Sequence, residues 1–268
     1  MSPTPHNQMI LRIKNALVSR LAPLLLGRHP RNTIGSFNYV NVRHVRTFLE
    51  RQAAALPAHD LVFLDVGAGR SPYRQCFAGK IGRYLAVDVE ESLPSNGGGG
   101  TGIEYHIGTA ESIPLPEASV DVVLFNQVLE HVLDPDASLS EIGRVLKPGG
   151  ILLGSVPHLS PVHLEPYDFR RYTDLGLRQM LLKHRFTEIS IDFSGSVYSS
   201  AALLVCMDWM LSRRQPDKPQ QFCTGRALLL SPLVATINVL ALAGDALLPN
   251  SWRSAANLCW FAKKASGI

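Results

Sequence analysis

Residues 64–73, LDVGAGRSPY, contain the residue types that hold a small charged ligand against a turn of the backbone. Asp65 stands two positions before Gly67, and Gly69 follows two positions after it. Glycines at this spacing allow a tight turn between a strand and its helix, at the edge where open α/β sheets bind ligands. Pro72 occupies the place of a third glycine and lacks the N–H that a pyrophosphate needs. The loop therefore predicts a ligand without a pyrophosphate, which disfavours an NAD-dependent dehydrogenase.

Two carboxylates further restrict which class of ligand the loop can bind. Asp65 lies beside the turn, where a carboxylate suits a ligand that is cationic at that point. Asp88 ends the next predicted strand, the place at which a carboxylate binds the hydroxyls of a ribose. A nucleoside with a positive amino group and no pyrophosphate fits both positions, and S-adenosylmethionine meets that description.

Short apolar runs from residue 61 onward predict the sheet that positions these residues. The runs are LVFLDV, RYLAVDV, IEYHI, VDVVLF, GILLGSV, FTEISIDF and the later LCWFAKK (258–264). Runs that are apolar at nearly every residue suit strands buried on both faces of a parallel sheet. Helical patterns at Pro135–Leu146 and Thr173–His184 alternate with them, and Thr173 is expected to cap the second helix. We expect an α/β fold with a doubly wound, mostly parallel seven-stranded sheet.

Four segments carry a resemblance to a known family. They are, in this order, LDVGAGRSPY, AVDVE, GTAESIPLPEASVDVVLFNQVLEHV and EIGRVLKPGGILLGSVP. The set resembles the class I S-adenosylmethionine-dependent methyltransferases, and most of all the broad type-11 methyltransferase family, over about residues 60–195. The resemblance implies an enzyme that transfers a methyl group and uses S-adenosylmethionine as its cofactor.

The resemblance also implies a set of cofactor-binding residues. In the family, the aspartate and glycines of the loop surround the methionine part, and the acid after the second strand binds the ribose. The family commonly has an adenine-binding aspartate where this chain has Thr109, so Ala110, through its N–H, and Glu111 beside it are the other candidates. VLKPGG (145–150) would be the turn into the fifth strand. The full set is Asp65, Gly67, Gly69, Asp88, Thr109, Ala110, Glu111, Asn126 and Gln127.

Three histidines follow predicted strands at the ligand edge: His131, His158 and His163. Methyl transfer depends on aligning the acceptor with the sulfur and excluding water, and a base helps when the acceptor is a hydroxyl. Histidine suits that task near neutral pH. His131 either takes part in the chemistry or only organises its turn, because assigning a catalytic role needs geometry.

The loop that contains His158 and His163 is the region where we expect the acceptor to approach. A structural loop held by salt bridges between Asp168 and the neighbouring arginines is the alternative. His158, His163 and Glu165 lack the i, i+4 or CxxC spacing of common metal sites, so we expect no metal.

Charge divides the chain into three expected parts: a basic amphipathic extension (1–50), a cofactor-binding domain (51–200), and an apolar helical segment with a final strand (201–268). The net charge is +4, but residues 1–49 hold Lys and Arg and no acidic residue, whereas the central part is acidic. An acidic central domain argues against nucleic acid as a partner.

The flanking segments leave two interpretations open. Met9–Leu26 has the spacing of an amphipathic helix, which either lies on an anionic membrane surface or packs against the domain. Ala201–Leu211 and Ala227–Leu248 are apolar helices. Ser231, Asn238 and Asp245 recur every seven residues in the second of these. They predict one polar stripe, for packing on the domain or for lying in a membrane interface. Polar residues in a stretch this short argue against a helix that spans the bilayer.

The remaining observations concern compartment and function. The four cysteines show no CxxC spacing, and the N-terminal segment lacks the pattern of a secretory signal, so we expect a cytoplasmic protein. Peripheral contact with the inner face of a membrane is a further expectation. The expected function is methylation of a small-molecule, glycan or lipid-linked acceptor, at a hydroxyl. The alternative is a non-catalytic membrane-associated scaffold with a methyltransferase-like fold.

Overall fold

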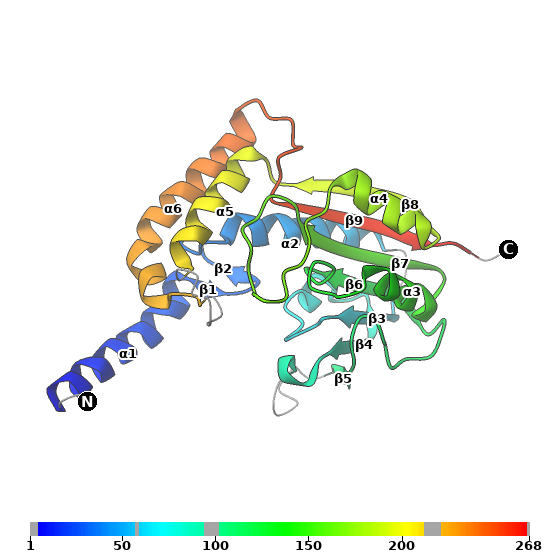
Figure 1. Ribbon diagram of the computed structural model, residues 1–268, viewed down its shortest axis with the longest axis horizontal. Helices are drawn as coiled ribbons and strands as arrows, with labels where there is room; N and C mark the ends of the chain where they lie inside the picture. The colour runs from blue at the N-terminus through cyan, green and yellow to red at the C-terminus, as the bar shows by residue number, and fades with distance from the viewer. Residues whose placement is uncertain (1–4, 57–58, 94–101, 212–220, 267–268) are drawn as a thin grey trace.

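A seven-stranded sheet with helices on both faces forms the centre of the structure (Figure 1). The computed structural model describes residues 5–56, 59–93, 102–211 and 221–266. The strand order is β5-β4-β3-β6-β7-β9-β8, and neighbours are parallel except β9, which runs antiparallel to β7 and β8. The strands are β3 Leu61–Val66, β4 Ile81–Asp88, β5 Glu104–Ile107, β6 Val120–Asn126, β7 Leu146–Pro157, β8 Phe186–Ser194 and β9 Asn257–Lys264.

The helices divide between the sheet and a group beyond one end of it (Figure 1). Helix α2 covers one face of the sheet, and α3 and α4 cover the other. Helices α5 and α6 pack side by side, and α6 also contacts α1 and α2. A short antiparallel pair, β1 Gly27–Arg28 and β2 Arg31–Asn32, follows α1. The helices are α1 Pro5–Leu25, α2 Tyr39–Ala55, α3 Pro135–Val145, α4 Asp174–Lys183, α5 Val197–Met210 and α6 Thr224–Leu247, with 3-10 turns at Arg74–Phe77 and Glu90–Ser92.

Strand β6 shows how the sequence builds both layers of the core. Val123 and Phe125 belong to the apolar cluster that includes α3 and α4. Val122 and Leu124 belong to the cluster on the opposite face, which includes α2. Successive side chains of a strand point to opposite faces, so a run that is apolar at every position must be covered on both. The doubly wound fold expected from such runs is confirmed.

Two local expectations were wrong. The glycine-rich loop is followed by the 3-10 turn Arg74–Phe77 and not by an α-helix, because Pro72 and Gly79 bound a segment too short for one. Strand β7 already begins at Leu146, so the expected turn VLKPGG largely lies within it, and the pairing with β6 shifts register there.

The predicted cap of α4 is confirmed, since the side chain of Thr173 accepts a hydrogen bond from the Gly176 N–H.

The expected division into three parts stays a prediction. Helix α2 runs across the boundary at residue 50 and packs against the sheet, and β9 lies between β7 and β8. The glycine tract 95–102 and the polar segment 213–221 fall outside the described residues, apart from the last residue of each.

Helix α6 turns its polar stripe toward the protein. Ser231 and Asn238 are buried, and Asp245 accepts hydrogen bonds from Ser196 and Ser199 at the start of α5. The outer positions of the helix carry large apolar side chains, with Leu229 79% exposed. The seven-residue repeat therefore marks the face that packs on the domain, and the opposite apolar face is uncovered.

Replacing Asn238 by alanine should destabilise the protein by about 2 kcal/mol, because one buried and one partly buried carbonyl lose their donor. The Asn238 side-chain amide donates to the backbone oxygens of Ile34 and Ser36, at 2.7 and 2.9 Å. Thermal or denaturant unfolding measures the change. Thr236→Ala, at an exposed position of the same helix, is the control and should stay within about 0.5 kcal/mol. Equal stability of both variants would contradict the packing role of the stripe.

Candidate active site

The glycine-rich loop leaves β3 at the carboxyl edge of the sheet. Gly67 and Gly69 both adopt positive φ angles, 67° and 50°, which favour glycine. A Cβ on Gly67 would lie 2.5 Å from a methyl group of Val128, so this glycine lets the loop pack on the segment after β6. A Cβ on Gly69 would meet no protein atom within 4 Å. The backbone at Gly69 therefore faces open space in which a ligand can lie.

Asp88 connects the loop to the end of β4. Its Oδ2 accepts a hydrogen bond from the Gly69 N–H at 2.7 Å, and its Oδ1 accepts one from the Val89 N–H at 2.8 Å. The side chain stays partly exposed. Each carboxylate oxygen has a second lone pair for a ligand hydroxyl. Asp88 is thus placed to fix the loop and to accept hydrogen bonds from a ribose at the same time.

Asp65 lies beneath the loop and is buried. Its Oδ2 accepts a hydrogen bond from the Tyr84 hydroxyl at 2.8 Å. Burial raises the pKa of the Asp65 carboxyl to about 6, although hydrogen bonds from Tyr84 and Ser71 partly oppose this shift. The charge of Asp65 therefore changes just below neutral pH.

The expected adenine-binding residues have local partners in the structure. Thr109 pairs with Ser112 in a short bridge and is exposed, while Ala110 is buried. Oε1 of Glu111 accepts a hydrogen bond from the Leu133 N–H at 3.1 Å. This bond gives Glu111 a part in closing the turn before α3. The contacts of these residues with adenine stay a prediction.

A polar network occupies the carboxyl ends of β6 and β7. Ser155 donates a hydrogen bond to Oδ1 of Asn126 and accepts one from Nε2 of Gln127 at 2.8 Å. Gln127, which has a φ of 57°, also reaches Asn257 at the start of β9 at 3.4 Å. Asn257 in turn donates to Asn41 of α2. Asn126 and Gln127 therefore lie at the edge where the sequence placed them, but Gln127 is held by β7 and β9.

Sequence reasoning missed Ser155, Asn257 and Asn41. Ser155 and Asn257 lie at the ends of apolar runs, a signal that polar residues at any strand end share, and Asn41 lies in helix α2. Tyr73 was quoted within the loop but given no role. Its hydroxyl lies 3.0 Å from Nε2 of His29, and burial raises the pKa of Tyr73 well above its usual range.

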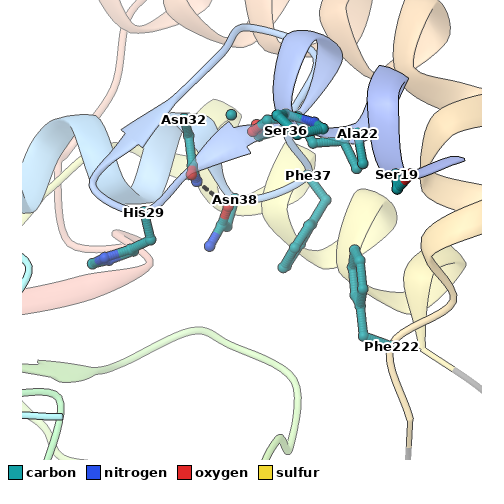
Figure 2. A pocket seen from close by; sticks show the side chains of 11 residues that line it. Ser19, Ala22, His29, Asn32, Ser36, Phe37, Asn38 and Phe222 are labelled. Carbon is teal, nitrogen blue, oxygen red and sulfur yellow. Dashed lines mark hydrogen bonds between the residues drawn. The ribbon is translucent and has the colours of Figure 1, made fainter. Parts of the chain in front are cut away.

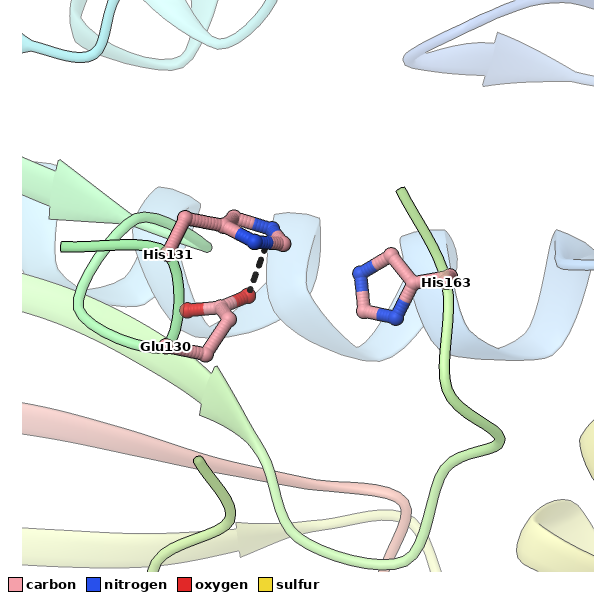
Figure 3. A group of neighbouring side chains, drawn as sticks. All are labelled: Glu130, His131 and His163. Carbon is pink, nitrogen blue, oxygen red and sulfur yellow. Dashed lines mark ion pairs between the residues drawn. The ribbon is translucent and has the colours of Figure 1, made fainter. Parts of the chain in front are cut away.

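Glu130, His131 and His163 come together beside this edge (Figure 3). Glu130 and His131 follow β6, and His163 lies in the loop after β7, the parallel neighbour of β6. The rings of His131 and His163 meet edge to face, with centroids 5.3 Å apart. Nε2 of His131 is 3.6 Å from Oε1 of Glu130. The grouping differs from the one weighed in the sequence, which combined His163 with His158 and Glu165.

Glu130 is fully buried, and neither of its carboxylate oxygens has a hydrogen-bond partner. Burial raises the pKa of the Glu130 carboxyl to about 8. Burial also lowers the pKa of His163 from its usual value, against the opposing charge of Asp168. Burial therefore favours the neutral forms of Glu130 and His163, and the carboxylate oxygens of Glu130 keep free lone pairs.

His158 lies apart from this group. Its Nδ1 donates to the Tyr172 backbone oxygen at 2.7 Å, and its ring meets Phe193 of β8 edge to face. These contacts suit a residue that anchors the loop to α4 and β8. The catalytic role expected for His158 stays a prediction, and the contacts of its side chain add no support for it.

The loop after β7 contains the salt bridge considered in the sequence. Arg171 donates to both carboxylate oxygens of Asp168, at 2.6 and 2.7 Å, and the Asp168 side chain is fully buried. Arg170 instead donates to the backbone oxygens of Val132 and Leu133. Arg171 therefore ties the loop to itself, Arg170 fixes it against the segment after β6, and this fixed loop presents His163.

A pocket of about 400 Å³ lies between the end of α1, the β1–β2 pair and Phe222 (Figure 2). Phe37 and Phe222 form an apolar side, with ring centroids 5.1 Å apart. Asn32 and Asn38, hydrogen-bonded to each other, and His29 supply polar groups. Because His29 contacts the Tyr73 hydroxyl, the pocket is linked to the glycine-rich loop.

Comparison with known proteins identifies the domain. Residues 64–154 match the family model described as a methyltransferase domain. The chain is also 31% identical over 174 residues to a protein of Mycolicibacterium smegmatis named as an S-adenosylmethionine-dependent methyltransferase, covering 62% of this chain and 66% of that protein. The chain carries a class I methyltransferase domain. The enzyme class and the cofactor expected from the sequence, S-adenosylmethionine, are those of this methyltransferase family.

Other methyltransferases match over shorter stretches. A ubiquinone biosynthesis O-methyltransferase of Parvibaculum lavamentivorans is 31% identical over 120 residues, covering 43% of this chain and 47% of that enzyme. A ubiquinone/menaquinone biosynthesis C-methyltransferase of Hydrogenovibrio crunogenus is 32% identical, covering 42% of this chain and 50% of that enzyme. The chain spans about half to two thirds of the length of these curated relatives.

Solved structures share the methyltransferase fold at low identity. A chain from the complex of the Haloferax volcanii Trm112 methyltransferase activator with a methyltransferase superposes with a TM-score of 0.54 at 17% identity, covering 85% of this chain and 93% of that one. The [4+2]-cyclase SpnF superposes with a TM-score of 0.53 at 18% identity, covering 84% and 82%. At such identities the likeness shows the fold alone.

Binding of S-adenosylmethionine should strengthen as the pH rises through about 6, because a cationic amino group prefers the ionised form of Asp65. Below that pH the affinity should fall by up to about tenfold per pH unit. Calorimetric titration between about pH 5 and pH 7.5 measures the change. Asp65→Asn should bind more weakly and without this pH dependence. The same pH dependence in both proteins would contradict the assignment.

Proposed function

We propose that this methyltransferase domain transfers a methyl group from S-adenosylmethionine to a hydroxyl of a lipid-linked acceptor. Small molecules and glycans are the other acceptors considered, and a lipid-linked acceptor is the one proposed. The observation that carries the cofactor part is the Gly69–Asp88 hydrogen bond, which fixes a glycine loop whose Gly69 faces open space. The acceptor part is supported by the apolar surfaces described below.

The residues of the loop fit this cofactor. Gly69 and Asp88 would hold the part between methionine and ribose, and Asp65 supplies a carboxylate for a cationic amino group. When bound, S-adenosylmethionine supplies a methyl group on a positively charged sulfur. The chain has to orient the acceptor, keep water away and accept or pass on a proton.

A proton leaves when a hydroxyl oxygen is methylated, and two imidazoles lie where it can be taken up. The Nδ1–H of His131 donates to the Tyr167 backbone oxygen at 2.9 Å, so its Nε2 keeps a free lone pair. In His163, Nδ1 lies 3.2 Å from Oδ2 of Asp168 and Nε2 is left free in the same way. These contacts support a role for His131 and His163, more than for His158, as proton acceptors beside the acceptor hydroxyl.

Exposed apolar side chains support an acceptor that resides in a membrane. On α6, Leu229, Leu240 and Leu247 are 79, 65 and 81% exposed, and Leu24 of α1 is 71% exposed. Helix α6 is by length and composition apolar enough to cross a membrane, and one third of its most apolar window is buried in the protein. The inward polar stripe favours a helix that lies at the surface. The basic N-terminal part would add attraction to anionic lipids.

The proposed protein is therefore a peripheral membrane enzyme that acts on the inner face of the membrane. The pocket next to Phe37 and Phe222 is also lined by the end of α1, the helix that carries the exposed Leu24. A lipid-linked acceptor held by the helices could therefore extend through the pocket toward Tyr73 and the loop.

Purified protein with methyl-labelled S-adenosylmethionine should label a component of a lipid extract. The labelled product should survive mild alkali, since a methyl ether is stable where a methyl ester is cleaved. Thin-layer chromatography of the extract measures the transfer. Asp88→Ala should abolish it, whereas Glu90→Ala, an exposed carboxylate just beyond β4, should not. Cofactor binding without labelling of any lipid, glycan or small-molecule fraction would favour the scaffold alternative.

The protein should bind vesicles that contain anionic phospholipid, and Leu229→Glu combined with Leu240→Glu should weaken this binding at least about tenfold, because each buried leucine contributes roughly 1.5–3 kcal/mol. Co-sedimentation at constant salt measures the binding. Leu175→Glu is the matched control, since Leu175 is 71% exposed on α4, away from α6 (Figure 1). An equal loss in the control would contradict a defined membrane surface.

A further inference from the structure

Three side chains beside the active-site edge offer ligand atoms to a single point in space. One ligand atom from each of Glu130, His131 and His163 lies within 4.8 Å of the other two (Figure 3). Tetrahedral ligands of a zinc ion lie about 3.4 Å apart, given bonds of about 2.0–2.2 Å. Oε1 of Glu130 and Nε2 of His131 are already 3.6 Å apart. Small side-chain rotations would bring the third ligand to the same distance.

Both histidines are oriented as metal ligands usually are. A metal-bound imidazole donates its other N–H to a carbonyl or carboxylate, which fixes the tautomer and the ring. His131 makes this bond from Nδ1 to the Tyr167 backbone oxygen at 2.9 Å. The Nδ1 of His163 faces Asp168 and the Pro161 oxygen. Figure 3 shows the other ring nitrogen of His163 on the side of His131 and Glu130.

Glu130 supplies the independent observation. Its side chain is fully buried, and both of its carboxylate oxygens lack a hydrogen-bond partner. A buried carboxyl without a partner is costly and calls for an explanation, such as a bound ion. His131 and His163 lie next to this carboxyl with free Nε2 atoms, so a cation at that point would satisfy all three side chains.

We propose that Glu130, His131 and His163 bind a divalent transition-metal ion of the zinc type. Two imidazole nitrogens and one carboxylate suit such an ion, whereas magnesium prefers a shell of oxygen ligands. Three protein ligands leave at least one coordination position open, as in catalytic zinc sites. This proposal replaces the expectation, made from the sequence, that the chain holds no metal.

The open position would take the acceptor hydroxyl, a use that rests on the proposed methyl transfer, although the metal site itself does not. A metal ion lowers the pKa of a bound O–H group. With the metal bound, the Nε2 atoms of His131 and His163 are ligands and no longer proton acceptors, so the hydroxyl proton passes to solvent. The oxygen forms a bond to the methyl carbon as the bond between carbon and sulfur breaks. The positively charged sulfonium becomes a neutral thioether, so charge and atoms balance.

Titration of zinc into the full-length, tag-free, metal-stripped protein tests the site without any methyl transfer. Calorimetry should show one ion bound per chain. Cobalt in place of zinc should give the visible absorption bands of a four- or five-coordinate site with nitrogen ligands. Glu130→Gln and His163→Ala should each weaken zinc binding by more than about tenfold, because even outer partners of metal ligands contribute that much. His59→Ala, an exposed histidine near β3, should bind zinc as the unchanged protein does.

Zinc binding that is equally tight in either ligand variant, or absent from the unchanged protein, would overturn the proposal. Thermal unfolding checks that the variants are folded, and Glu130→Gln should unfold at the same or a higher temperature because it removes an unpaired buried carboxyl. Titration of S-adenosylmethionine into the same samples separates the two proposals. Zinc binding without cofactor binding would reject the proposed function alone, and the reverse result would reject the metal site alone.

Discussion

The hydrogen bond from the Gly69 N–H to the Asp88 carboxylate joins the loop after β3 to the end of β4, and the rest of the site is built outward from this junction. It holds the loop so that Gly67 can lie against Val128 in the segment after β6. Three residues beyond Val128 the chain reaches His131. Because parallel strands end at one edge of the sheet, a single contact between two loops brings the cofactor loop and the histidine group to the same side.

Much of this arrangement could be predicted from the sequence, because strand existence and the glycine loop depend on local patterns. Apolar runs identified β3 to β9, although the edge strands β5 and β8 are only partly buried, and the place of Asp88 after a strand identified its edge. The Glu130–His131–His163 group could not be predicted. His163 belongs to an irregular loop whose path is fixed by the Asp168–Arg171 pair, and no period in the sequence encodes that path.

The polar network at the ends of β6 and β7 could not be predicted from the sequence either. Gln127 and Asn257 are far apart in the sequence and meet only because β9 pairs with β7. The seven-residue repeat of α6 could be read from the sequence, but the direction in which its polar face points could not. The sequence could place Asn238 and Asp245 on one face, but only their partners in the fold show that this face is the inner one. Buried polar groups need partners, and here the domain supplies them.

The position of β9 sets an order of events during synthesis. Strand β8 has β9 as its sheet neighbour, and β9 is made only after α5 and α6. While the chain is growing, β3 to β7 can pair with one another, but β8 lacks the strand that it pairs with in the fold. The sheet therefore cannot be completed until the apolar helix pair between β8 and β9 has been made. The closing strand holds the two ends of this helix pair, because α5 follows β8 and β9 follows α6.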